Sequence, residues 1–158
     1  MEEMNSDLDR EYDEYEKACG DLQDPVLRIL RTHLYIEFLL ERVILSLLPR
    51  GDRAIEKGRL TFNQKLVLVS AFDIVSDDFL TVIRNLNSVR NRCAHERHKI
   101  ITMSDVELIG RPLGKRFNVL RKKHHDDIPM CLKRTMDQMA GGFASIVDGI
   151  EKRSHHVD

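Results

Sequence analysis

Apolar residues recur three and four positions apart along most of the chain, which is the spacing of one face of an α-helix. The strongest such segment begins at Asp24-Pro25, a capping residue followed by the proline that suits the first helical position, and it ends before Pro49. Its apolar positions are Val26, Ile29, Leu30, Leu34, Phe38, Val43 and Leu47. We expect one long helix over residues 25–48, buried on more than one side.

Two further amphipathic helices are predicted before residue 100. Thr61-Phe62-Asn63-Gln64 has the spacing of a capping box and opens a helix that includes residues 66–72. Ser76-Asp77-Asp78 supplies N-caps for a third helix, from about residue 77 into the 90s. Its apolar face consists of Phe79, Val82, Ile83, Leu86, Val89 and Cys93. The charged segment 50–60 is expected to be a loop with at most a short turn.

The pattern weakens after His98. Ser104-Asp105-Val106-Glu107 has the form of a second capping box, whose helix is soon cut off by Gly110 and Pro112. Residues 113–127 are basic and then acidic, and they predict a surface segment without a clear element. A last long helix begins near Pro129, and Gly141-Gly142 inside it suits a close approach by another helix. No segment shows the alternation of a strand, so the fold class is all-α, an up-and-down bundle of four to five helices.

Charge divides the chain into two parts. Residues 1–24 hold ten acidic and two basic residues, a net charge of −8, whereas the whole chain carries −1. Residues 25–158 therefore carry +7, a modest excess that is compatible with an anionic partner such as RNA. We expect residues 1–24 to be an acidic arm or short helix and residues 25–153 to form the helical bundle domain. The arm is either a solvated segment or one that folds back over the basic surface.

Several classes of protein are disfavoured by the sequence. The three cysteines are far apart and lack CxxC spacing, and the N-terminal residues have no apolar signal segment, which together favour a cytoplasmic protein. The apolar stretch 29–48 carries too many charges for a membrane span. His124-His125-Asp126-Asp127 and His155-His156 contain metal-ligand types, but adjacent residues seldom hold one ion, so neither a metal nor a cofactor is expected. Walker, GxGxxG, GxSxG and HExxH motifs are absent.

The most informative chemistry lies on the third helix. At 100° per residue, one stripe contains hydrogen-bonding groups with little charge: Arg84, Asn87, Ser88, Asn91 and His95. A solvated face more often carries Glu and Lys, so this stripe predicts a surface that meets a ligand. Arg90 falls toward the apolar side, and a straight helix does not bring it to His95. Asn91 and His95 are neighbours, four residues apart.

The segment Leu86-Asn87-Ser88-Val89-Arg90-Asn91-Arg92-Cys93-Ala94-His95-Glu96 resembles the signature of the HEPN superfamily, in which an arginine is followed after four to six residues by a histidine. An asparagine often comes directly after that arginine, as Asn91 does here. Within the superfamily the chain is similar to toxin-type ribonucleases and to the mannitol operon repressor group. The resemblance spans roughly residues 25–100 and, more loosely, 128–150.

The resemblance implies a metal-independent endoribonuclease, acting as a toxin or defence effector, that works as a homodimer through the third helix. His95 would be the general acid or base, Arg90 would stabilise charge on the phosphate, and Asn91 would orient His95 or hold a phosphate oxygen. Contacts to the RNA backbone would come from the basic residues nearby, Arg84, Arg92, Arg97 and Lys99. Toxins silenced by adenylylation often carry Tyr two residues after the histidine; Arg97 stands there, which argues against that silencing.

Two alternatives stay open. Arg90 can instead be a helix-end arginine paired with Glu37 or Glu41, while His95 caps the C-terminus of its helix, where a cation is favoured. The chain can also be a non-catalytic helical regulator, similar to the mannitol operon repressor, that uses the polar stripe to bind a protein partner or antitoxin.

Overall fold

The structure is a computed structural model that describes residues 2–19 and 23–154, without the side chains of residues 2–9 and 11. The described residues form eight α-helices, one 3₁₀ turn and no strand, which confirms the all-α prediction. In chain order the elements are α1 (Glu2–Cys19), α2 (Pro25–Leu47), α3 (Gly51–Glu56), α4 (Phe62–Ala71), α5 (Asp77–His95), α6 (Met103–Gly110), η1 (Arg111–Leu113), α7 (Lys115–Lys123) and α8 (Ile128–Ser154).

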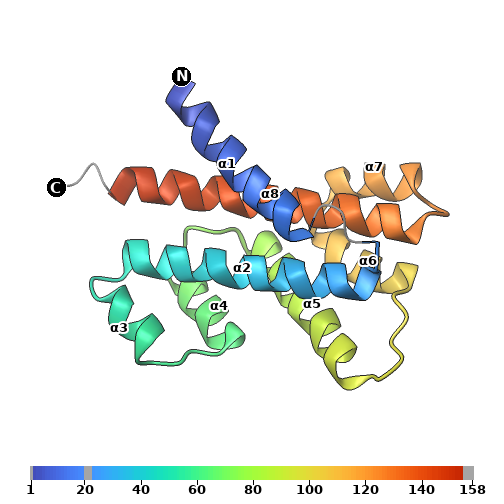
Figure 1. The fold of residues 1–158 in the computed structure, drawn as a ribbon, viewed down its shortest axis with the longest axis horizontal. Coiled ribbons are helices and arrows are strands. Elements are labelled where there is room, and N and C mark those ends of the chain that lie inside the picture. Colours follow the sequence, from blue (N-terminus) through green and yellow to red (C-terminus); the bar gives the residue numbers. More distant parts are fainter. Residues whose placement is uncertain (1, 20–22, 155–158) are drawn as a thin grey trace.

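The two longest helices, α2 and α8, lie side by side and run in the same direction along the long axis of the molecule (Figure 1). Leu39 and Leu40 of α2 and Leu132 and Phe143 of α8 are fully buried. Burial of each such side chain contributes about 1.5–3 kcal/mol. These two helices therefore form the centre of the core. An ion pair between Arg42 and Glu151 joins them near their C-terminal ends.

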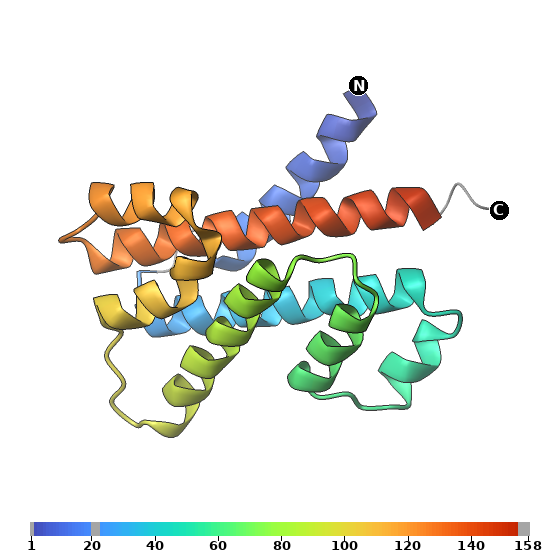
Figure 2. The ribbon, with the colours of Figure 1, turned by 180° about the vertical axis from the view of Figure 1, so that it is seen from behind.

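Helices α4 and α5 both pack against α2 and lie next to each other at a similar slant to it, as the view from behind shows (Figure 2). The capping box that opens α4 is present, because Thr61 accepts from the Gln64 backbone and Gln64 reaches back to the Thr61 backbone. Ser76 caps α5 through the Phe79 backbone nitrogen. The C-terminal end of α5 lies at the edge of the molecule, away from α8. The segment 77–95 is thus anchored at its start and exposed at its end.

The remaining helices cover the outside of this frame. Helix α1 packs on α2 and α8, and its Tyr15 and Cys19 are buried there. The leading segment is therefore helical and is docked through its C-terminal half. Helices α6 and α7 and the turn η1 close the end of the molecule at which α8 begins.

The structure differs from the predicted elements in four places. The capping box of α6 is Thr102 with Asp105, two residues earlier than expected, because Asp105 reaches back to the Thr102 backbone. The segment 50–60 contains a short helix, α3, and the segment 113–127 contains α7. These short elements raise the count above the expected four to five helices. The parallel arrangement of α2 and α8 also departs from an up-and-down bundle.

The two glycines of α8 have different surroundings. A Cβ atom on Gly142 would lie 3.2 Å from Cε2 of Phe79, so the neighbour of this glycine is a side chain of α5 and not the backbone of the closely packed helix that the sequence suggested. A Cβ atom on Gly141 would meet nothing within 4 Å. In the described part of the chain, no helix is both long and apolar enough to cross a membrane.

Candidate active site

The exposed end of α5 carries the predicted catalytic residues. Leu86 and Val89 are fully buried and fix the helix against α2, while His95 is exposed and is the last residue of the helix. Arg90 and Asn91 are half-buried between these extremes, and Nη1 of Arg90 donates to Oδ1 of Asn91 at 3.2 Å. Arginine and asparagine are therefore held together one turn before the histidine.

A polar network beneath this pair joins the buried His33 and Asn87 to the exposed Asn63, so Asn87 faces other helices and not the ligand surface that the sequence predicted for its stripe. Nε2 of His33, on α2, lies 2.9 Å from Oδ1 of Asn87 on α5. The Asn87 amide nitrogen donates to Oδ1 of Asn63 on α4 at 3.0 Å. Because the Asn87 amide nitrogen is committed to Asn63, its oxygen must accept, which assigns the proton of His33 to Nε2. The ring of His33 stacks on Phe62 with centroids 4.1 Å apart.

The chemistry of His33 follows from this position. Burial lowers the pKa of His33 below its ordinary value, the Asn87 hydrogen bond and the charge of Glu37 raise it, and the charge of Arg90 lowers it, with burial dominant. His33 is therefore a neutral imidazole that holds Asn87 in place. The sequence contains a weak signal for it, since a histidine on the buried face of a long apolar helix needs a partner.

The alternative in which Arg90 pairs with Glu37 or Glu41 is not what the structure shows. Both carboxylates are bonded by Nζ of Lys65 on α4, at 2.7 Å from Glu37 and 2.6 Å from Glu41. The side chain of Lys65 is 9% exposed, so this interaction ties α4 to α2 in a largely buried position. Arg90 is directed to Asn91 instead. His95 does lie in the last turn of its helix, as the capping alternative requires.

The four predicted RNA-binding residues separate into two pairs. Arg84 and Arg97 are exposed. Arg92 and Lys99 both bond to the buried Asp105 of α6, at 3.0 Å and 3.1 Å. Burial alone would raise the pKa of Asp105, but hydrogen bonds from the Thr102 backbone and from Lys99 outweigh it and hold the pKa below its ordinary value. Arg92 and Lys99 thus anchor the loop that follows His95, which leaves only part of their charge for a ligand.

Within the described residues, no hydrogen bond or ion pair joins His95 to Arg90 or Asn91, so one chain does not assemble all three groups around a single point. In the same residues, no three His, Cys, Asp or Glu side chains gather as a metal site, and His125 pairs with the adjacent Asp126. His155 and His156 lie outside the described residues. The end of α5 can therefore bind an anion through the Arg90 guanidinium and exchange a proton through the His95 imidazole.

No family model, no curated protein and no solved structure matches the chain in comparisons with known proteins. The assignment of function therefore depends on the residues and geometry described above.

Proposed function

We propose that the protein is a metal-independent endoribonuclease of the HEPN type, with an HEPN-like helical bundle and a site formed by Arg90, Asn91 and His95. The observation that carries the proposal is the hydrogen-bonded Arg90–Asn91 pair one turn before an exposed histidine, at a helix end that is open to a large ligand. A guanidinium suits phosphate oxygens, and histidine is the commonest general acid or base in enzymes, so Arg90 and His95 together have the two functions that RNA cleavage needs.

The reaction would proceed by attack of a ribose 2′-hydroxyl on the adjacent phosphorus. The new O2′–P bond forms as the P–O5′ bond breaks, which leaves a 2′,3′-cyclic phosphate and a free 5′-hydroxyl. His95 takes the proton of the attacking 2′-hydroxyl, and the leaving 5′-oxygen takes a proton from water or from the His95 of a second copy. Arg90 stabilises the negative charge that grows on the phosphate oxygens, and Asn91 holds the Arg90 guanidinium in position.

A second copy of the chain would complete the site. His95 stands apart from Arg90 within one chain, so a dimer through α5 would place the histidine of one copy near the arginine of the other. A shallow groove along the outer face of α4 supports this arrangement, because its lining is mostly apolar: Val67 and Ala71 are exposed, Leu68 and the preceding Leu60 are half-buried, and Asn63 and Gln64 are the polar members. Asn63 lies on this outer face and joins it to α5 through Asn87.

The test is cleavage of varied single-stranded RNAs by the purified chain with EDTA present. We expect products with 2′,3′-cyclic phosphate ends, and a loss of roughly 100-fold or more in rate for both Arg90→Ala and His95→Ala. His98→Ala is a matched control, because it removes another exposed histidine three residues further on, and it should retain the full rate. Cleavage that survives both site substitutions would contradict the proposal.

The apolar outer face of α4 also favours a second candidate, a non-catalytic regulator similar to the mannitol operon repressor group that binds another protein, such as an antitoxin. Contiguous exposed apolar surface often marks a protein-binding site. This candidate predicts a folded, dimeric protein that cleaves none of the RNAs tested. Retention of the dimer together with the absence of cleavage would favour it over the ribonuclease.

A further inference from the structure

The positive charge of the chain is concentrated in one stretch, residues 84–123, which we call the basic region. It holds eleven Lys and Arg residues against three Asp and Glu residues, a net charge of +8. Because residues 25–158 together carry +7, the rest of that part of the chain contributes only −1. The basic region comprises the C-terminal part of α5, all of α6 and α7 and the turn η1. These elements pack on one another and lie toward the end of the molecule at which α8 begins (Figure 1).

An open groove of about 520 Å³ runs between α5 and α6 in the basic region. Nδ2 of Asn85 on α5 donates to the Leu108 carbonyl of α6 at 2.7 Å and joins its two sides. Arg92 lines the groove seven residues after Asn85, on the same face of α5. Arg111, at the end of α6, has a side chain that is 75% exposed. The groove is therefore polar, open to solvent and bordered by arginines from both sides.

The acids of the groove do not cancel its positive charge, because each of them pairs with two cations. The partners are Arg92 and Lys99 for Asp105, and Arg111 and Arg121 for Glu107. Each group of three side chains therefore has an excess of one positive charge. Helix α7, to which Arg121 belongs, carries five basic residues and no acid. An extended polyanion would meet an excess of positive charge along the whole of this path.

The groove leads to the candidate active site. Arg92 and His95 are three residues apart, which makes them neighbours on the surface of α5. At 1.5 Å per residue, Asn85 and His95 lie about 15 Å apart along the helix axis. The acidic helix α1 extends away from α6 and α7 in both views (Figure 1 and Figure 2). The groove is therefore open to a ligand that also reaches His95.

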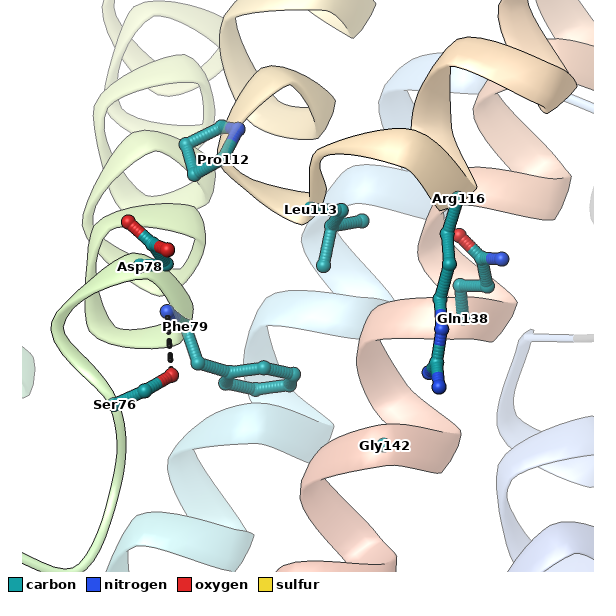
Figure 3. A pocket seen from close by; sticks show the side chains of 8 residues that line it. All are labelled: Ser76, Asp78, Phe79, Pro112, Leu113, Arg116, Gln138 and Gly142. Atoms are coloured by element: carbon teal, nitrogen blue, oxygen red, sulfur yellow. Dashed lines mark hydrogen bonds between the residues drawn. The ribbon is translucent and has the colours of Figure 1, made fainter.

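A smaller hollow of about 210 Å³ begins at Pro112, where α5 and α8 meet η1 and α7 (Figure 3). Asp78 and Arg116 stand on opposite sides of it, so its two charges balance each other. The excess charge continues instead along α7, where Lys115 and Lys122 are exposed and share one face of the helix. A polyanion is therefore expected to pass from the groove onto α7 and not into the hollow.

We propose that the groove between α5 and α6, together with the exposed face of α7, binds the phosphate backbone of a single-stranded RNA that is cut at His95. Guanidinium groups bind phosphate oxygens in a bidentate manner, which suits the arginines of the groove. A positively charged groove that follows the backbone is how proteins bind single strands of any sequence. The inference rests on the proposed function for the identity of the ligand as RNA.

Binding is measured with the full chain carrying His95→Ala, so that no RNA is consumed. Fluorescence anisotropy follows a labelled uridine dodecamer at several salt concentrations. Each phosphate contact of a single strand contributes about 0.7 to the slope of log affinity against log salt. We expect Arg111→Ala and Lys122→Ala each to lower this slope by about 0.7, which weakens binding about fivefold at about 0.1 M salt. Arg53→Ala is the control, because it removes an exposed arginine of α3 at the other end of the molecule and should leave the slope unchanged.

Arg111 and Lys122 are both exposed, so neither substitution should disturb the fold. The same slope in all of these proteins, or the absence of RNA binding, would overturn the proposal. A glutamate-rich peptide of equal charge that binds more tightly than the RNA would assign the groove to an acidic protein and overturn it as well.

Cleavage is measured separately with chains that retain His95. We expect the KM for the dodecamer to rise in Arg111→Ala and Lys122→Ala by about the factor lost in binding. Cleavage whose KM is the same in these variants overturns this inference alone. RNA binding that depends on the groove residues, without any cleavage, overturns the proposed reaction alone.

Discussion

His33 shows how one buried residue can control the position of an exposed site. It lies on α2, more than fifty residues before the motif, yet it contacts Asn87 one turn before Arg90. Because burial keeps the imidazole neutral, its protonation must oppose folding. The hydrogen bond from His33 therefore couples the stability of the α2–α5 contact to pH.

We expect the free energy of unfolding to fall as the pH drops below about 6.5, the ordinary pKa of the group. The folded pKa lies below the unfolded one, so the unfolded chain binds a proton first. The stabilising contribution is then complete above pH 6.5 and is lost as the pH falls toward the folded pKa. The slope is at most about 1.4 kcal/mol per pH unit. Urea unfolding at several pH values should show a shallower slope for His33→Gln and an unchanged slope for the exposed control His98→Gln.

Sequence reasoning at this scale supplies the candidate residues of the site but not the residues that support them. Arg90, Asn91 and His95 lie within six positions of each other, so a local pattern reveals them. His33 and Asn63 come from two other helices, and only the packing of α2, α4 and α5 brings them to Asn87. The same limit applies to Glu37 and Glu41. The sequence suggested Arg90 as their partner, but both carboxylates pair with Lys65 from another helix.

At the scale of elements, Asp105 joins the start of α6 to the loop that follows α5. It accepts from the Thr102 backbone and bonds to both Arg92 and Lys99, so the segment 96–102 is held at each end. Asp105→Asn removes the charge that organises these contacts. We expect a loss of about 1.5–3 kcal/mol in the free energy of unfolding, together with faster hydrogen exchange in residues 96–102.

Asp148→Asn is the control for this prediction, because Asp148 forms a single pair with Lys152 within one helix. Such a pair contributes only about 0.2–0.5 kcal/mol. An equal effect of the two substitutions, measured by chemical unfolding, would show that Asp105 has no special role in the loop.

Element prediction succeeded where caps and apolar spacing agreed and failed where charge dominated. The helices at 25–48, 61–72 and 77–95 are opened by caps that satisfy backbone groups, and each buries a regular stripe. Segment 113–127 has almost no apolar stripe, and its helix α7 is held by Phe117, which is 2% exposed and lies where a Cβ atom on Gly110 would stand. That contact joins two segments of the chain and cannot be derived from the local pattern.

At the scale of the whole molecule, the proposed shared site depends on a dimer through α5 whose interface extends over the neighbouring outer face of α4. Val67 on that face is 67% exposed, and Val119 on α7 is exposed to almost the same extent, at 65%. Aspartate at either position meets solvent in the monomer, so neither change should disturb the fold by more than about 0.5 kcal/mol. Only Val67 lies on the face that we expect a second copy to cover.

We therefore expect Val67→Asp to yield a monomer and Val119→Asp to keep the dimer, as measured by light scattering during gel filtration at micromolar concentration. If the two copies share a site, RNA cleavage should fall with the dimer in Val67→Asp while the helical content stays that of the unmodified chain. A monomeric Val67→Asp protein that still cleaves at the full rate would place Arg90, Asn91 and His95 in a site that one chain completes alone. A dimer that survives the substitution would mean that the copies associate elsewhere, and α4 would then be free for a different protein.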